Sequence, residues 1–199
     1  MSQEPRIRRA WARITDWLSQ NTPRHAEALN PGADRSMLDE AEQALATRIP
    51  EELRVWLLMN NGSTAKDVLE GRLCRPHQDS VFLPRGNVFL DLRRMVAAQR
   101  NLLAAGGDWR PEWIPFARHF DAAYGYFLDT GAGSGEAPVM YFAEAALPRL
   151  AFPCLADFLE ATADALEDAG GIRALGNQVL FRPVTDAGVL EWKRAATAP

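Results

Sequence analysis

The first part of the fold is decided by the stretch Ile49-Pro50-Glu51-Glu52-Leu53-Arg54-Val55-Trp56-Leu57-Leu58-Met59-Asn60-Asn61-Gly62. Pro50 suits the first turn of a helix, where the N–H that proline lacks would have no partner. The two glutamates after it lie favourably near the positive end of the helix dipole. Leu53, Trp56 and Leu57 share one face, which we expect to be buried. Gly62 ends the helix, because glycine readily adopts the left-handed conformation.

Two more helices are predicted before this segment. Apolar side chains recur at helical spacing over about residues 6–19, and Pro23 ends that helix. Residues 30–34 are rich in turn formers. Ser36, with Asp39 three residues later, resembles a capping box and predicts a helix start there. The N-terminal third is therefore expected to be helical.

The middle of the chain predicts short strands and two further helices. Val68-Leu69 and Val81-Phe82-Leu83 are candidate short strands between prolines and glycines. A helix is expected from Leu92 to Leu103, ended by two glycines. Three strands follow at about residues 113–118, 124–129 and 138–142, and a helix at about residues 155–169.

The last thirty or so residues are less regular. Gln178 to Val184 is predicted to be an edge strand, because Pro183 is tolerated only at an edge or an end. Asp186 is then expected to cap a short helix that carries Leu190 and Trp192.

The order of these elements predicts an α+β fold: a mixed, mostly antiparallel central sheet with helices packed around it, since the strands are too close in sequence for crossover helices. We expect a single domain over residues 1–199. The helix at about residues 6–19 and the segment at about residues 170–199 would be additions to it.

Composition narrows the functional classes. Hydrophobic residues make up 47% and charged residues 24%, as in ordinary globular proteins. The net charge of −4, with carboxylates among the arginines, argues against direct binding of nucleic acid. Cys74 and Cys154 alone do not make a disulfide scaffold, and whether they pair is left open. Without a long apolar segment, we expect a cytoplasmic protein that does not enter a membrane.

Metal and nucleophile motifs are incomplete. Cys74-Arg75-Pro76-His77 has a plausible zinc-ligand spacing, but no second pair accompanies it. Ser134 lies in a glycine-rich stretch that lacks the pattern of a nucleophile elbow or a phosphate-binding loop. We therefore expect no metal and no cofactor.

The strongest enzyme-like feature is the carboxylate pair Asp121 and Asp129, which brackets a predicted strand. Two carboxylates held close together divide acid and base roles in many hydrolases. Both residues also suit turns, because aspartate hydrogen-bonds to the backbone there.

An aromatic pair follows the fourth predicted helix. Trp109 and Trp113 would either form an exposed patch for a partner or fill the core beside the sheet. In a regular strand, Trp113 and Pro115 would face one side and Ile114 and Phe116 the other. The core is favoured for Trp113, and both alternatives stay open for Trp109.

Taken in order, these segments resemble the SMI1/KNR4 family of the SUKH superfamily over roughly residues 34–168. The residues that carry the resemblance are Pro50, Leu53, Trp56, Leu57, Asn61, Gly62, Trp113, Pro115 and Gly125, with the strand Phe127-Leu128-Asp129. One departure is the turn before that strand. Relatives often have a Gly-Asp-Gly type of sequence there, and this chain has Asp121-Ala122-Ala123-Tyr124-Gly125.

The resemblance implies helices around one central sheet and a protein that works by binding another protein. Many bacterial members are immunity proteins that neutralise toxins, whereas a fungal member regulates cell-wall synthesis. We therefore expect a non-enzymatic binding module that occludes a toxin domain, as a monomer or weak dimer. The alternatives are a hydrolase using Asp121 and Asp129, and a regulatory scaffold for a housekeeping protein. The residues expected to contact the partner are Asp67, Glu70, Asp79, Trp109, Asp121, Tyr124 and Asp129.

Overall fold

The structure, a computed structural model, describes residues 3–64, 78–119, 121–133, 136–144, 146–168, 170–175 and 179–195. Its helices are α1 (Glu4–Asn21), α2 (Pro23–Glu27), α3 (Arg35–Leu45), α4 (Glu51–Met59), the 3-10 helix η2 (Gln78–Ser80), α5 (Leu92–Ala104) and α6 (Leu155–Asp168). Its strands are β1 (Asn87–Phe89), β2 (Trp113–His119), β3 (Gly125–Asp129), β4 (Val139–Ala143), β5 (Ala146–Phe152), β6 (Phe181–Asp186) and β7 (Val189–Arg194).

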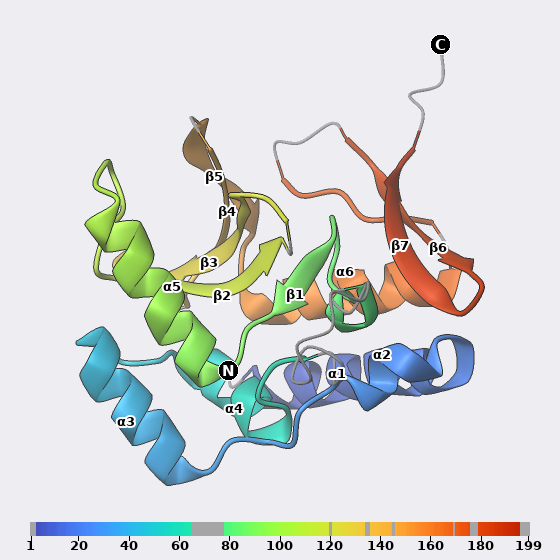
Figure 1. Cartoon of the computed structure of the whole chain (residues 1–199), viewed down its shortest axis with the longest axis horizontal. Helices are drawn as coiled ribbons and strands as arrows, with labels where there is room; N and C mark the ends of the chain where they lie inside the picture. Colours follow the sequence, from blue (N-terminus) through green and yellow to red (C-terminus); the bar gives the residue numbers. More distant parts are fainter. Residues whose placement is uncertain are drawn as a thin grey trace.

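The central sheet has the order β1-β2-β3-β4-β5, with every neighbouring pair antiparallel. Strands that follow one another in the sequence are therefore neighbours in space. Short connections join the strands β2 to β5, and α5 lies between β1 and β2. The strands β6 and β7 form a separate two-stranded sheet (Figure 1). The predicted α+β fold is confirmed.

Helices cover both faces of the central sheet. The main core joins one sheet face to α1, α4 and α6, with the closely packed pair α1 and α6 on the outer side (Figure 1). The other sheet face carries a second cluster of buried rings, Trp113, Phe127 and Phe142, against which Leu102 of α5 and Trp109 pack. Both faces of the central strands are therefore buried, which explains their nearly continuous apolar sequences.

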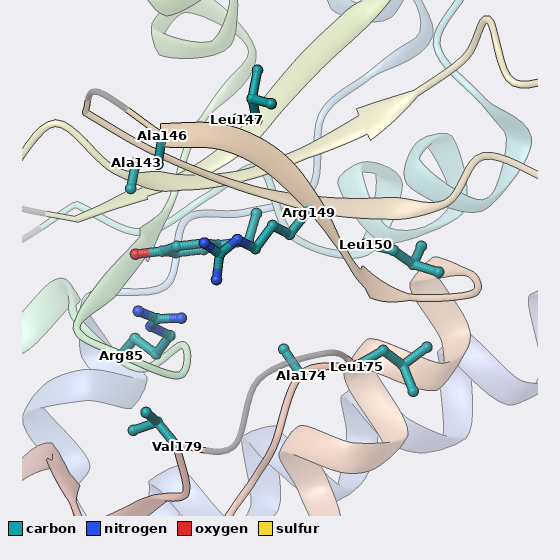
Figure 2. A pocket seen from close by; sticks show the side chains of 10 residues that line it. Arg85, Ala143, Ala146, Leu147, Arg149, Leu150, Ala174, Leu175 and Val179 are labelled. Carbon is teal, nitrogen blue, oxygen red and sulfur yellow. The ribbon is translucent and has the colours of Figure 1, made fainter.

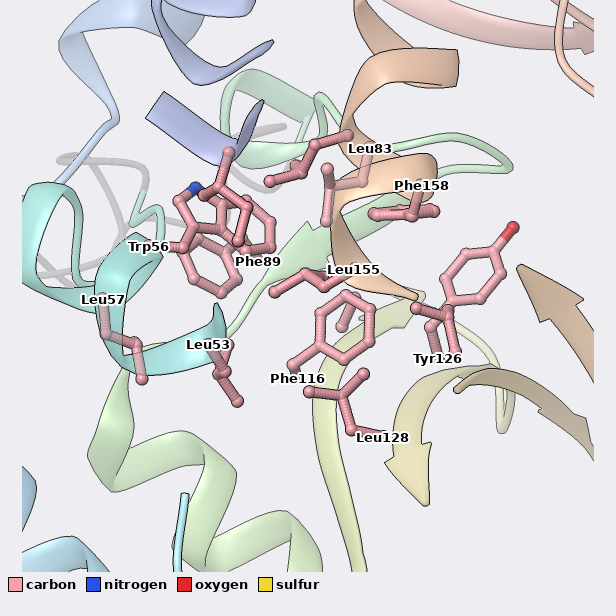
Figure 3. Packing of buried hydrophobic residues seen from close by; sticks show 14 of the residues in the cluster. Leu53, Trp56, Leu57, Leu83, Phe89, Phe116, Tyr126, Leu128, Leu155 and Phe158 are labelled. Atoms are coloured by element: carbon pink, nitrogen blue, oxygen red, sulfur yellow. The ribbon is translucent and has the colours of Figure 1, made fainter. Parts of the chain in front are cut away.

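Helix α4 supplies the centre of the main core (Figure 3). Leu53, Trp56 and Leu57 are all fully buried, as the helical spacing predicted. The Trp56 ring stacks on Phe89 with a centroid separation of 3.7 Å and meets Trp11 edge-on at 5.6 Å. One side chain thus connects α4 to β1 and to α1.

Asn61 and Gly62, which follow α4, pack against the start of α5. Asn61 Oδ1 accepts a hydrogen bond from the Leu92 N–H at 3.0 Å, so it satisfies one free donor at the start of α5. Gly62 has φ of 80°, and a Cβ there would lie 2.4 Å from the Asp91 nitrogen. Gly125 is similarly constrained, because a Cβ would lie 2.1 Å from the Ala117 carbonyl oxygen of β2. Asn61 thus satisfies a backbone donor, and Gly62 and Gly125 allow close backbone contacts that a larger residue would prevent.

Helices α1 and α6 run in the same direction and are joined by two arginines of α1, each of which pairs with two carboxylates of α6. Arg6 bonds Asp157 and Glu160, and one heptad later Arg13 bonds Asp164 and Glu167. Beneath these pairs, the apolar face of α1 is buried, including Ile7, Ile14 and Leu18. The helix expected at residues 6–19 is therefore confirmed, and its apolar face is part of the main core.

Three local predictions before β2 are corrected. Helix α3 is capped by Asp34, which accepts from the Met37 N–H at 2.9 Å, so Ser36 lies inside the helix. Pro23 does not simply stop α1, because it starts α2. Val81-Phe82-Leu83 is not a strand; the chain there enters a tight turn, and the strand β1 follows it. The candidate strand Val68-Leu69 lies outside the described residues.

The C-terminal prediction is partly wrong. The edge strand is β6, shifted slightly from the predicted range, but no helix follows Asp186. Ala187 and Gly188 both have positive φ, as in a type I′ hairpin turn, and the chain returns as β7. Leu190 and Trp192 point inward, and Trp192 Nε1 donates to the Phe82 carbonyl at 3.0 Å.

Two strand details were missed. The strand β5 was not predicted, and it lies at the outer end of the sheet order, where its Pro148 is tolerated. In β2 the register shifts between Pro115 and Ala117, so the predicted alternation does not continue through the strand. Ile114, Phe116 and Ala117 all belong to the main core, and Trp113 faces the second cluster.

Candidate functional site

Arg85 lies in a tight turn before β1. Leu83 and Asn87 exchange backbone hydrogen bonds of 3.1 and 3.2 Å, and the Asn87 side-chain amide donates to the Pro84 carbonyl at 2.7 Å. Arg85 itself has φ of 65°, a conformation that costs a non-glycine residue roughly 1–2 kcal/mol. Backbone strain of this kind is concentrated at functional sites, which makes Arg85 a candidate functional residue.

The Arg85 guanidinium lies between two aromatic rings. Its central carbon is 3.9 Å from the ring centroid of Tyr141 on β4 and 4.8 Å from that of Phe181 on β6. The Nε and Nη1 atoms are buried and have no hydrogen-bond partner among the described residues. Aromatic rings attract the cation, but its N–H groups prefer oxygen acceptors. The charge is thus held in place with part of its bonding capacity unused.

Beside Arg85 is a pocket of about 300 Å³. We call it the Arg85 pocket; its lining residues are Arg85, Tyr141, Ala143, Ala146, Leu147, Arg149, Leu150, Ala174, Leu175 and Val179. Figure 2 shows Arg85 reaching in from the turn before β1 and Arg149 from β5. None of these lining residues is acidic, so the pocket carries two positive charges in a chain of net charge −4.

Exposed leucines surround this pocket. Leu147 is 76% exposed, Leu150 44% and Leu175 49%; we call them the rim leucines. Leu150 lies on β5 across the pocket mouth from Leu175, and Leu147, also on β5, projects from the side of the strand that faces away from Arg85 (Figure 2). The only other strongly exposed large apolar side chains in the described part of the chain are Leu58 and Leu103. A gathering of exposed leucines on a folded protein is typical of a protein-binding surface.

Tyr124 lies next to Arg85 on the other side of the turn. Both residues line a second hollow of about 300 Å³. The Tyr124 ring lies 4.4 Å from the His119 ring, centroid to centroid. Burial raises the pKa of the Tyr124 hydroxyl, and the Arg85 charge opposes that rise. Burial also lowers the pKa of His119, with nearby Asp121 acting in the opposite direction.

Trp109 is half-buried on the other face of the sheet. Its ring meets Trp113, Phe127 and Phe142 at centroid distances of 5.4, 5.0 and 5.1 Å, and its Nε1 donates to the Gln99 side chain at 2.8 Å. It also forms part of the wall of a groove of about 660 Å³. Both sequence alternatives are therefore partly met, since Trp109 packs on the core and still lines a groove.

The predicted carboxylates are not brought together. Asp129 ends β3, and its Oδ1 accepts from the Gly131 N–H at 3.0 Å. Asp121 precedes the opposite end of that strand and is exposed, and five strand residues span roughly 16 Å. Asp79 is buried and pairs with Arg24 at 2.6 Å. The remaining predicted contacts, Asp67 and Glu70, lie outside the described residues.

The candidate metal-binding and nucleophile motifs of the sequence add no functional site among the described residues. Cys74 and His77, the candidate zinc ligands, lie outside the described residues, as does Ser134. Within the part that is described, no group of three or more His, Cys, Asp or Glu side chains could hold a metal ion. Cys154 is a buried free cysteine, and burial raises the pKa of its thiol. None of the helices in the described ranges has the length and apolar character needed to cross a bilayer.

The residues that form the Arg85 pocket were not predicted from the sequence. Arg85 lies among turn formers, and Arg149 lies in a strand that was not predicted. The segment Leu147-Pro148-Arg149-Leu150 did contain a signal, since two leucines beside a proline and an arginine suit an exposed edge strand. The pairing of Arg85 with Tyr141 and Phe181 depends on tertiary structure alone.

Comparison with known proteins agrees with the fold and its motifs. The sequence profile of the SMI1/KNR4 family (SUKH-1) matches residues 32–161, which include α3 to α5 and the whole central sheet. No curated protein matches the chain. The matched region contains the Asn61-Gly62 junction, Trp113 and Gly125, whose structural roles are described above. The chain belongs to the SMI1/KNR4 family (SUKH-1).

Proposed function

We propose that this chain is a non-enzymatic protein-binding module that neutralises a toxin domain, as an immunity protein does, by covering it. The SUKH family is known for immunity-type proteins and is generally non-enzymatic, which supports this class of function. The observation that carries the proposal is the gathering of the rim leucines at the edge of the sheet.

These side chains indicate where the partner docks. Leu147, Leu150 and Leu175 expose apolar surface that water solvates poorly, so burying it against a partner is favourable. They lie on an edge strand and on the segment opposite it, so one partner surface can contact both. Occlusion follows if that partner surface includes the toxin's active site.

The net charge of the chain also bears on the kind of partner it would bind. The net charge of −4 favours encounter with a basic partner, such as a nuclease domain, because opposite potentials speed association. The Arg85 pocket is a local exception, and it would meet an acidic group within that partner. A hydrolase that uses Asp121 and Asp129 together is not favoured, because these residues lie at opposite ends of β3.

The proposal is tested by a tagged pull-down from a lysate of the source organism, washed at low and at moderate salt. The captured protein is then expressed in a bacterial host, alone and together with this chain. Growth arrest that this chain relieves supports toxin neutralisation. A harmless housekeeping partner would favour the regulatory scaffold, and no stoichiometric partner would contradict the binding-module proposal.

A further inference from the structure

We infer that the Arg85 pocket is a binding site for an organic carboxylate with a short apolar body. This goes beyond the proposed function, because the site is defined by its own chemistry and can be occupied without the protein partner.

The Arg85 cation lacks partners for part of its guanidinium. Two nitrogen atoms of Arg85 are buried without hydrogen-bond partners, and no ion pair to Arg85 is formed within the described ranges. A buried N–H group without an acceptor is unfavourable, and the guanidinium that carries these two groups lines the Arg85 pocket. Carboxylates and phosphates both offer two oxygens to the planar guanidinium fork, so the charge alone selects an anion of one of these two kinds.

The fold also fixes the direction of the Arg85 side chain. The turn holds Arg85 at positive φ, and Tyr141 and Phe181 contact its guanidinium, from β4 and β6 respectively. The ring contacts limit the freedom of the arginine, so less entropy is lost when a ligand binds. The strained turn and the two rings therefore preorganise the cation.

The walls of the Arg85 pocket are mostly apolar. Besides Arg85, Arg149 and Tyr141, the lining side chains are alanines, leucines and a valine. No serine, threonine, asparagine or lysine of the described chain lines it. Inorganic phosphate has no hydrocarbon to bury against the alanines, leucines and valine of these walls. A singly charged carboxylate attached to a short hydrocarbon chain fits both the arginines and the walls.

The size of the pocket agrees with this ligand class. A volume of about 300 Å³ lies at the lower end of the range for small-molecule sites. A carboxylate with a few carbon atoms therefore fits within it. The carboxylate can come from a free organic acid or from an acidic side chain of a partner protein, and the two sources share the same contact with Arg85.

The test is a titration of the purified full-length protein, followed by the NMR signal of the Arg85 Nε–H group. Sodium hexanoate is the probe, hexanamide is its uncharged control, and inorganic phosphate is the competing anion at constant ionic strength. We expect a saturable shift with half-saturation at about 1 mM hexanoate, as for weak ligands of this size. Hexanamide should give no saturable shift, and phosphate should bind at least about tenfold more weakly.

Variants assign the effect to the pocket. Arg149→Gln leaves the Arg85 signal in place and should weaken hexanoate binding about tenfold, whereas Arg9→Gln, on the exposed face of α1, should not change it. In Arg85→Asn the reporter signal is removed, so binding is followed by calorimetry and should be lost. Asparagine tolerates positive φ, which keeps the turn intact.

A second arm identifies the source of the carboxylate. The blocked peptide acetyl-Leu-Glu-Leu-amide is titrated in the same way. Binding at least about tenfold tighter than hexanoate assigns the site to an acidic side chain of a partner; otherwise hexanoate binding assigns it to a free acid. The inference is overturned if neither ligand gives a saturable shift, or if hexanamide or phosphate binds as well as hexanoate. Because no partner protein is used, this result is independent of the pull-down.

Discussion

Trp56→Ala tests whether α4 organises the core. Trp56 is fully buried, stacks on Phe89 at an interplanar angle of 5°, and meets the rings of Trp11 and Phe116 edge-on. Truncation of a large buried aromatic side chain costs about 3–5 kcal/mol, because apolar contact is lost and a cavity remains. The loss of three ring contacts favours the upper half of this range.

One contribution acts in the opposite direction. The Trp56 Nε1 atom is buried without a hydrogen-bond partner in the described part of the chain, so its removal relieves a cost of about 1 kcal/mol. We therefore expect Trp56→Ala to lower the free energy of unfolding by about 4 kcal/mol. Trp56→Phe is the matched control. It keeps a ring against Phe89 and removes the unpaired N–H, so it should cost about 1–2 kcal/mol.

The assay is urea unfolding followed by circular dichroism. The midpoint should fall while the slope stays unchanged, which would show that the native state is destabilised without a change in the surface exposed on unfolding. A loss below about 1 kcal/mol for Trp56→Ala, or equal losses for the alanine and phenylalanine variants, would refute this account of the core.

Three further predictions concern other parts of the fold. Gly125→Ala should destabilise the protein by about 3 kcal/mol, because its Cβ would meet the backbone of β2; Gly170→Ala, where nothing lies within 4 Å, should stay within about 0.5 kcal/mol in the same urea assay. Trp192→Phe should cost about 1–2 kcal/mol, since the Phe82 carbonyl loses its donor, and an unchanged melting temperature would contradict this role for the hairpin. Burial lowers the pKa of His25, with Asp79 opposing and Arg24 adding to that shift. The unfolded chain therefore binds the proton more readily, and stability should be full above about pH 6.5 and fall below it. His25→Gln should show a smaller fall between pH 7.5 and 5.5 by thermal melting, and an identical fall would exclude His25 as its source.

Elements with strong periodicity could be predicted from the sequence. The apolar stripe of α4 predicted its buried face, and Pro50 marked its start. The predicted end was wrong, because the helix stops at Met59 with Asn60 in an extended conformation, before Gly62 is reached. Errors arose where two local preferences compete. Asp34 and Ser36 are both good capping residues, and the side-chain bond to the Met37 N–H decides for Asp34.

The C-terminal hairpin shows the same competition. Asp186 suits a helix cap, but Ala187 and Gly188 form a hairpin turn. Leu190 and Trp192 are two residues apart, a spacing that puts both side chains on one face of a strand but on opposite sides of a helix. This spacing agrees with the pairing of β7 with β6, and the helix was predicted because the capping preference of Asp186 was given more weight.

The candidate site was less predictable than the fold. The position of the Arg85 guanidinium depends on two rings from β4 and β6. These strands are distant in the sequence and meet only in the folded chain. The exposure of Leu147 depends on β5 being an edge strand, a consequence of sheet order. Local patterns contain neither fact, so the sequence analysis favoured loop carboxylates instead.

The measurement that tests the central claim most directly is the affinity of the captured partner for a rim variant. The double variant Leu147→Asp/Leu150→Asp is compared with wild type and with Leu103→Asp, an exposed leucine on α5, by isothermal titration calorimetry. If the rim leucines are the docking surface, the rim variant should bind at least about 100-fold more weakly, and the α5 variant within about threefold of wild type. Wild-type affinity in the rim variant, with folding unchanged, would contradict the account.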